Sequence, residues 1–239
     1  MIEGKISVKA AISGGRREVH RIWMDKSLED RDSWYIRKIA EEKGIPVELV
    51  RRSVITEKAE GKTHGGILAE VSARRYDSLA DCLKAEIPFA AVLEGVEDPF
   101  NLGYVMRTLY SAGCTGLLVK ERDWSMAEKT ILRSSAGAFD LMNVVMSDDL
   151  CRDVRELRNH GLTCYAAMRR DAVVYDQADY RKPVILMIGG EMRGLSSGLL
   201  READRNIYIP YANDFRNALN AAGAAAVLAF EVFRQRREG

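Results

Sequence analysis

Short runs of consecutive apolar residues, each ending in a glycine or a polar turn, recur through the second half of the chain. They lie at residues 89–93, 116–120, 162–167 and 184–188. Runs of about five apolar residues are typical of strands covered on both faces, as in a parallel sheet. Helical patterns separate these runs. This alternation predicts an α/β fold with a mostly parallel sheet over residues 88–239.

The first part of the chain predicts a smaller α/β unit. Its expected elements are helices at 8–13, from Ser33 to Gly44 and at 47–52, and strands at 19–24 and 66–72. Glycines end the first two helices, as is common at helix C-termini. We therefore divide the chain into a first domain at 1–76, a linker at 77–87 and a second domain at 88–239.

Two strands of the second domain run directly into loops of small residues. The apolar run at 184–188 is followed by Gly189 and Gly190, and a second predicted strand occupies residues 206–210. If these strand ends lie side by side, their free backbone groups make a small-molecule pocket, because α/β sheets bind ligands at the carboxyl ends of their strands. The loop after the first strand is no phosphate loop, since Leu195 replaces the Walker lysine and Glu191 the middle glycine of a dinucleotide fingerprint. A neutral or cationic ligand is favoured.

The segment at 94–107 predicts the start of a helix that carries two candidate functional residues. Asn101 is a plausible N-cap, and an apolar stripe follows it at Leu102, Val105, Met106 and Leu109. Arg107 lies off this stripe. From the pattern alone, Asn101 is a cap and Arg107 a solvated cation.

Composition and charge narrow the classes of protein and the cellular environments that fit this chain. The 239 residues carry a net charge of +1, and residues 1–80 hold 16 Lys+Arg against 13 Asp+Glu, which leaves 20 against 22 in the remainder. This mild basic excess permits an RNA-facing first domain. Four cysteines without paired spacing favour buried thiols over a metal or disulfide site, and no apolar run is long enough to span a membrane. We expect a soluble cytoplasmic protein without a metal.

Basic pairs at element ends are candidate RNA contacts. The pairs Arg16–Arg17, Arg51–Arg52 and Arg74–Arg75 are placed to bind phosphates, and His64, in a glycine-rich loop, is placed to contact a base or a ribose. Ordinary solvated surface, and a loop histidine without a chemical role, are the alternatives.

Three motifs in order resemble the SpoU or TrmH branch of the SPOUT methyltransferases, which methylate ribose 2′-hydroxyls of RNA with S-adenosylmethionine. They are the segment 98–103 with Arg107, the segment 189–195, and Ile209–Pro210 with Leu219–Asn220. The resemblance covers most of residues 88–237, and residues 1–76 resemble the small RNA-binding domain of many members. It implies a C-terminal trefoil knot, an exceptional topology, and a homodimer whose subunits share each active site.

The resemblance also implies roles for particular residues. Arg107 is the implied catalytic residue, oriented by Asn101 and Glu191, with Asn220 near the ribose hydroxyl. Electrostatic stabilisation of the developing alkoxide is the favoured role for Arg107, and general base is the alternative. Backbone groups of the second and third motifs hold the cofactor; the positions concerned are Gly189, Gly190, Ile209, Pro210, Ala218 and Leu219. Serines usual in the third motif are replaced here by Ala218 and Ala222. Loss of one neutral hydrogen bond, about 0.5–1.5 kcal/mol, slows a reaction without abolishing it.

These features predict an RNA 2′-O-ribose methyltransferase, with ribosomal RNA favoured over transfer RNA because of the first domain. A transfer RNA 2′-O-methyltransferase, a methyltransferase acting on a base nitrogen, and an RNA-binding or ribosome-assembly module with weak chemistry are the alternatives.

Overall fold

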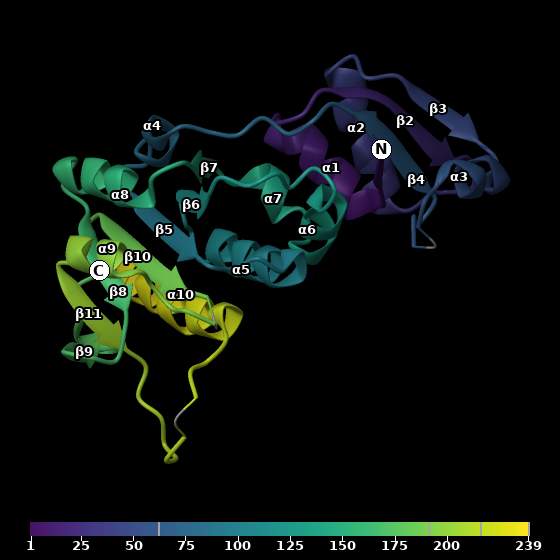
Figure 1. Cartoon of the computed structure of the whole chain (residues 1–239). Helices are drawn as coiled ribbons and strands as arrows, with labels where there is room; N and C mark the ends of the chain where they lie inside the picture. The colour runs from purple at the N-terminus through teal and green to yellow at the C-terminus, as the bar shows by residue number, and fades with distance from the viewer. Residues whose placement is uncertain (62, 191, 216, 239) are drawn as a thin grey trace.

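A computed structural model describes residues 1–61, 63–190, 192–215 and 217–238 of the chain. It contains two separate sheets, one of four strands and one of seven. Figure 1 shows the four-stranded sheet at one end of the molecule, with helix α1 (Lys5–Gly14) facing the large domain. None of the described helices is long and apolar enough to cross a membrane.

The four-stranded sheet has the order β1-β4-β2-β3. Its strands are β1 (Ile2–Glu3), β2 (Val19–Asp25), β3 (Val47–Val50) and β4 (Ile67–Val71), and its helices besides α1 are α2 (Arg31–Glu42) and α3 (Arg52–Lys58). The predicted helix at 47–52 is wrong. Residues 47–50 instead pair in parallel with β2, and the helix begins only at Arg52. Pairing with a neighbouring strand outweighs a weak local helix signal.

The seven-stranded sheet is parallel throughout and has the order β7-β6-β5-β10-β8-β11-β9. Its strands are β5 (Phe89–Glu94), β6 (Gly116–Lys120), β7 (Val144–Ser147), β8 (Thr163–Ala167), β9 (Ala172–Val174), β10 (Val184–Gly189) and β11 (Arg205–Tyr208). The helices are α4 (Leu79–Cys82), α5 (Pro99–Ser111), α6 (Glu128–Ser134), α7 (Ala138–Leu141), α8 (Leu150–Asn159), α9 (Ser197–Glu202) and α10 (Ala221–Glu238), with a 3-10 turn at Tyr175–Gln177. The predicted α/β class with a parallel sheet is confirmed.

Alternate residues of the central strands enter different cores. Val184, Leu186 and Ile188 pack with α5 and α10, whereas Ile185 and Met187 pack with α8 and α9 on the other face. Because successive strand side chains point to opposite faces, a run that is apolar throughout must be covered on both sides. This explains why strands in this half show no polar alternation.

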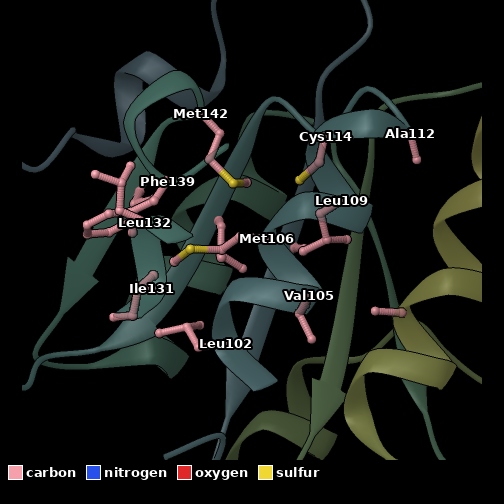
Figure 2. Packing of buried hydrophobic residues seen from close by; sticks show 14 of the residues in the cluster. Leu102, Val105, Met106, Leu109, Ala112, Cys114, Ile131, Leu132, Phe139 and Met142 are labelled. Atoms are coloured by element: carbon pink, nitrogen blue, oxygen red, sulfur yellow. The ribbon is translucent and has the colours of Figure 1, made fainter. Parts of the chain in front are cut away.

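Helix α5 is set on the sheet by its apolar stripe. Leu102, Val105, Met106 and Leu109 are all buried, and Figure 2 shows them facing the sheet. The prediction that Asn101 is the N-cap is wrong, since the Asp98 carboxylate accepts the N–H of Asn101 at 2.8 Å and the helix begins at Pro99. Proline suits the first helical position because the missing N–H would have no helical partner there.

Candidate functional site

The loops that leave β5, β10, β8 and β11 meet at one edge of the sheet, because the strands are parallel. The second and third motifs lie in the loops after β10 and β11. The prediction that these two strand ends are direct neighbours is wrong, since β8 lies between them. The two loops nevertheless border the same edge, and the first motif joins it through the loop after β5, the direct neighbour of β10.

The paired glycines at the end of β10 lie against neighbouring backbone. A Cβ atom on Gly190 would lie 2.1 Å from the carbonyl oxygen of Gly95, and one on Gly189 would lie 2.3 Å from the carbonyl carbon of Gly194. No side chain fits at such distances, since real Cβ contacts stay beyond about 3.0 Å. The two loops therefore pack backbone to backbone, which requires glycine at both positions.

Glu94, the last residue of β5, ties the first and second motifs together. Its carbonyl oxygen accepts the N–H of Gly190 at 2.6 Å. Its carboxylate accepts the N–H of Ser196 at 2.6 Å, at the start of α9. Both ends of the loop at 190–196 are thus held by one residue. Sequence analysis missed Glu94. The available signal was its position as the first charged residue after the apolar run at 89–93.

The loop between β11 and α10 carries the third motif and projects from the sheet edge (Figure 1). Its two ends are joined by a side chain, since the Tyr211 hydroxyl accepts the N–H of Leu219 at 2.8 Å. The guanidinium carbon of Arg169, after β8, lies 4.3 Å from the centre of the Tyr211 ring. Tyr211 and Arg169 were missed too, because no sequence signal pairs them.

Asn220 directly precedes the last helix, α10. Its side-chain oxygen accepts the N–H of Gly223 at 2.7 Å, which caps α10. Ile209 is half-buried against the core, whereas Pro210, Ala218 and Leu219 are exposed. The third motif therefore presents backbone groups and an apolar side chain at a solvent-open edge.

Arg107 lies on the outward face of α5, separate from the buried stripe. Phe100 and Tyr104 share this face, because residues three, four and seven apart on a helix are neighbours. Both aromatic rings are about half exposed, at 53% and 49%. In the described part of the chain no hydrogen bond or ion pair holds the Arg107 guanidinium, so it is available to a ligand or a second chain. Asn101 lies near the start of the same helix, half-buried.

Glu191, predicted to orient Arg107, lies outside the described residues. The remaining polar groups at the edge are backbone donors and acceptors, the Glu94 carboxylate, which accepts hydrogen bonds, and the Tyr211 hydroxyl, beside apolar Ile209 and Leu219. This set suits an adenosine with a cationic substituent better than a polyphosphate, because a carboxylate repels phosphate. The described residues include no cluster of three or more His, Cys, Asp or Glu side chains able to hold a metal.

The predicted RNA contacts fall into two groups. Arg51 and Arg52 are exposed where β3 meets α3, and they stay candidates. His64 is buried, with Nδ1 accepting the N–H of Gly66 at 3.1 Å. Arg17 is buried between the two domains and ion-paired to Asp140. Arg74 is buried as well, with its guanidinium bound to backbone carbonyls of the large domain. Burial contradicts the prediction that His64, Arg17 and Arg74 contact RNA.

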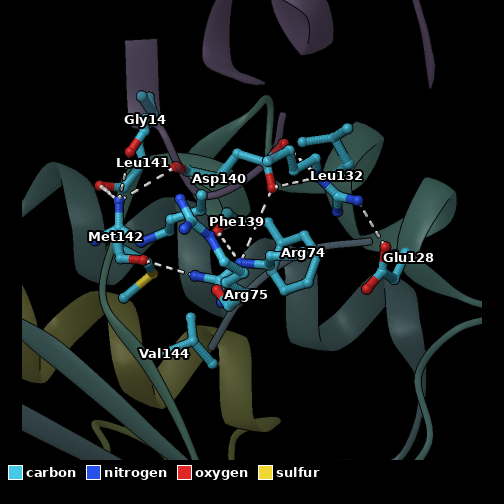
Figure 3. A network of polar contacts seen from close by, with 12 residues as sticks. Gly14, Arg74, Arg75, Glu128, Leu132, Phe139, Asp140, Leu141, Met142 and Val144 are labelled. Carbon is cyan, nitrogen blue, oxygen red and sulfur yellow. Dashed lines mark hydrogen bonds and ion pairs between the residues drawn. The ribbon is translucent and has the colours of Figure 1, made fainter. Parts of the chain in front are cut away.

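The Arg16 guanidinium is also bound by groups of the protein itself. Its Nε atom lies 3.1 Å from both oxygens of Asp77, and its Nη1 atom donates to the carbonyl oxygens of Asp140 and Leu141. The prediction for Arg16 is therefore wrong as well. Both arginines join the two domains, and Figure 3 shows this network at their boundary. Their partners lie far away along the chain, so no local pattern indicated them.

Both domains match known families. Residues 88–230 match the SpoU rRNA methylase family, and residues 1–77 match the substrate-binding domain of RNA 2′-O ribose methyltransferases. A TrmH-family tRNA/rRNA methyltransferase of Bacillus subtilis is 30% identical over 92% of this chain and 90% of its own length. A 23S rRNA (guanosine-2′-O-)-methyltransferase of Shewanella oneidensis is 29% identical over 99% of this chain and 98% of its own.

A solved structure shares the whole architecture. The AdoMet-bound rRNA methyltransferase of Sinorhizobium meliloti superposes with a TM-score of 0.77 and 26% identity, over 97% of this chain and 85% of that one. The knotted threading of the C-terminal segment stays a prediction. The domain matches, the relatives and the shared fold agree, and the chain therefore belongs to the SpoU rRNA methylase family of RNA methyltransferases.

Proposed function

We propose that ribosomal RNA is the substrate of this methyltransferase, which acts on a ribose 2′-hydroxyl with S-adenosylmethionine as methyl donor. The observation that carries the proposal is the pairing of two domains, a substrate-binding unit at 1–77 and a methylase unit at 88–230, in one chain. The Shewanella relative that spans both units is a 23S rRNA enzyme. The Bacillus relative, whose name includes both tRNA and rRNA, makes transfer RNA the second candidate. The cytoplasm is the proposed location.

The loops after β10 and β11 hold the cofactor in this proposal. S-adenosylmethionine supplies an electrophilic methyl group on a sulfonium cation. The backbone of Gly189, Gly190, Ile209 and Leu219 binds the adenosine part, with Pro210 and Ala218 beside it. Glu94 fixes the loop at 190–196. These groups orient the donor, because methyl transfer needs the oxygen, carbon and sulfur in line.

Arg107 is the proposed catalytic residue. Arginine side chains stay protonated near neutral pH, so the guanidinium acts through its charge, stabilising the negative charge that develops on the ribose oxygen. It also binds the adjacent phosphate. The hydroxyl proton passes to solvent water as the oxygen–methyl bond forms and the sulfur–methyl bond breaks. Asn101, Glu191 and Asn220 position the RNA and the loops around it.

We also propose a homodimer in which Arg107 serves the cofactor loops of the partner. Phe100 and Tyr104 on α5 and Phe230 and Phe233 on the neighbouring α10 expose large aromatic side chains. Exposed aromatic side chains of this kind favour a protein interface on the outward face of α5. Arg107 lies on that face, so pairing two copies through it brings the guanidinium to the other subunit.

The direct test compares Arg107→Ala with Arg201→Ala, which removes an equally exposed arginine on α9. Transfer of a labelled methyl group to ribosomal RNA is measured along with S-adenosylmethionine binding by calorimetry. We expect Arg107→Ala to lose about 100- to 1000-fold in kcat, the cost of removing one electrostatic stabiliser, with cofactor affinity unchanged. Arg201→Ala should keep both. A methylation rate for Arg107→Ala equal to wild type refutes the catalytic assignment.

Subunit mixing tests the shared site. Arg107→Ala and Gly190→Val proteins are each expected to be inactive, since valine cannot fit against Gly95. In heterodimers an intact pocket meets an intact arginine only if Arg107 acts across the interface. An equal mixture should then recover about a quarter of wild-type activity. Recovery of none would show that Arg107 acts within its own subunit.

The alternative is an RNA-binding module without methyl transfer, favoured by Ala218 and Ala222 in place of the usual serines. Tight binding of ribosomal RNA together with no calorimetric signal for S-adenosylmethionine would establish it. Digestion of the labelled product to nucleosides separates ribose from base methylation.

A further inference from the structure

The boundary between the two domains contains an interdomain charge cluster. Its members come from the loop between α1 and β2, the segment before α4, and helices α6 and α7; they are Arg16, Arg17, Arg74, Asp77, Glu128 and Asp140. Three are cations and three are anions, so the cluster is neutral. Figure 3 shows Arg74 directed at Asp140 and at backbone carbonyls of the large domain.

Arg17 links two elements of the large domain to the first domain. Its Nε atom lies 3.0 and 2.9 Å from the two oxygens of Asp140, and its Nη1 atom lies 2.8 Å from a Glu128 oxygen. Burial lowers the pKa of Arg17, but the charges of Asp140 and Glu128 outweigh it, and the net pKa is raised. Burial also raises the pKa of Asp140, against the attraction of Arg17 and Arg74. The side chain of Asp140 is 0% exposed and that of Arg17 is 3% exposed. Removing one member of an ion pair buried this deeply leaves an uncompensated charge, which is strongly destabilising.

Arg74 holds the connecting segment, which lies between β4 and α4, against the large domain. Its Nε atom donates to the carbonyl oxygen of Phe139 at 3.0 Å, and its Nη2 atom donates to that of Met142 at 2.9 Å. Asp77 makes two further hydrogen bonds to the large domain. Its N–H donates to the carbonyl oxygen of Val144, and its carboxylate accepts the N–H of Val144, each at 2.9 Å. The connecting segment therefore lies along the large domain instead of crossing solvent as a free linker.

The helices at the boundary touch without intervening side chains. A Cβ atom on Gly14, at the end of α1, would lie 1.8 Å from the carbonyl oxygen of Asp140. One on Gly137, before α7, would lie 2.6 Å from the Cβ atom of Ala10 in α1. One apolar cluster also runs from Val8 and Ile12 of the first domain to Phe139 of the second. Close packing and buried ion pairs together leave little freedom for rotation between the domains.

We infer that Arg17, Arg74 and Asp140 are positioning residues that hold the substrate-binding domain at one distance and orientation from the methyl-transfer site. The enzyme then selects its target nucleotide partly by the distance of that nucleotide from the RNA element that the first domain binds. A free linker would let the site reach many nucleotides, because a flexible chain samples a wide range of end-to-end distances. The inference rests on the proposed function for its substrate, and on the boundary contacts for its geometry.

The test uses the full-length protein with two changes at the boundary. Asp140→Asn keeps the shape of the side chain and removes its charge. Arg17→Lys keeps the charge, but a single ammonium cannot contact both Asp140 and Glu128 as the guanidinium does. The matched control is Asp148→Asn, which breaks an exposed ion pair with Arg152. Circular dichroism and S-adenosylmethionine binding confirm that each variant keeps its fold.

Two readouts follow. Spin labels on cysteines introduced at Glu42 and Arg201, in a Cys151→Ser background, report the interdomain distance distribution without RNA. The labelled protein is mixed with a large excess of unlabelled protein, so that a dimer carries at most one labelled subunit and the measured distance lies within one chain. Ribose-methylation mapping of ribosomal RNA reports which nucleotides are modified. We expect one narrow distance in wild type and control, and a broad distribution in both boundary variants. Their kcat/KM at the target should fall about ten- to hundredfold, as a small misplacement predicts, with methylation spreading to neighbouring nucleotides and cofactor affinity unchanged.

The outcomes separate the two proposals. An unchanged distance distribution in both boundary variants overturns the inference, whatever the activity. A broadened distribution with wild-type rate and target also overturns it, because the boundary then has no part in selection. If the wild-type protein methylates no RNA, the proposed function fails, while the distance measurement still decides whether the cluster fixes the domains.

Discussion

Substitution of Gly190 by alanine tests whether the backbone contact between the β5 and β10 loops builds the cofactor site. The added Cβ atom would lie 2.1 Å from the carbonyl oxygen of Gly95 and 2.5 Å from its carbonyl carbon. Both neighbours are backbone atoms, so no side-chain rotation relieves the contact. The loops must separate by about an ångström to restore ordinary van der Waals distance.

That separation acts on the groups proposed to hold the cofactor. The 2.6 Å hydrogen bond from Gly190 to the carbonyl oxygen of Glu94 lengthens, and so does the 2.9 Å bond from Gly194 to Gly190. Forcing one methyl group into a closely packed site costs about 1–3 kcal/mol. If this cost falls on the bound conformation of the loop, the Kd for S-adenosylmethionine rises about 5- to 150-fold.

Calorimetry with S-adenosylmethionine measures the effect, and thermal unfolding shows whether the protein stays folded. Gly198→Ala is the matched control. It lies in α9, at the other end of the same loop, where the new Cβ atom meets chiefly the movable sulfur of Cys151 at 2.9 Å. Alanine also favours helix over glycine. Wild-type affinity in folded Gly190→Ala protein would refute the assignment of this contact to the cofactor site.

Two further predictions concern other loops and the thiols. Tyr211→Phe removes the hydroxyl that accepts the Leu219 N–H, so the Kd for S-adenosylmethionine should rise about two- to tenfold with kcat at saturating cofactor unchanged; tighter binding would instead show that Tyr211 competes with the cofactor. Burial raises the pKa of Cys82, Cys114 and Cys164 to about 12, so iodoacetamide at pH 8 should modify the native protein only at the half-buried Cys151. Mass spectrometry checks this, and more than one adduct on folded protein would contradict it.

The sequence predicted those features that short-range patterns determine. Continuous apolar runs identified the buried parallel strands, and the spacing of Leu102, Val105, Met106 and Leu109 identified the buried face of α5. The outward position of Arg107 followed from the same spacing. The three motifs predicted the SpoU methylase family, because their order was read directly along the chain.

Features that depend on partners far along the chain were not predictable. Residues 47–50 form a strand because β2 lies beside them, which their own composition does not indicate. Arg16 and Arg17 resemble surface cations in the sequence, since they lie in a polar turn between a helix and a strand. The carboxylate that pairs with buried Arg17 belongs to Asp140, which lies 123 residues later in the chain. The order β10-β8-β11 was missed for the same reason, as it reflects crossovers instead of local pattern.

The separation between Arg17 and Asp140 bears on how the protein is made. Domains generally fold as units during synthesis, the N-terminal one first. The first domain emerges from the ribosome long before α7 exists, so its arginines must spend that interval hydrated, and docking onto the second domain comes late. Assembly of the finished molecule thus ends with the dehydration of a charged surface, a step we expect high salt to slow by screening the attraction between the two halves.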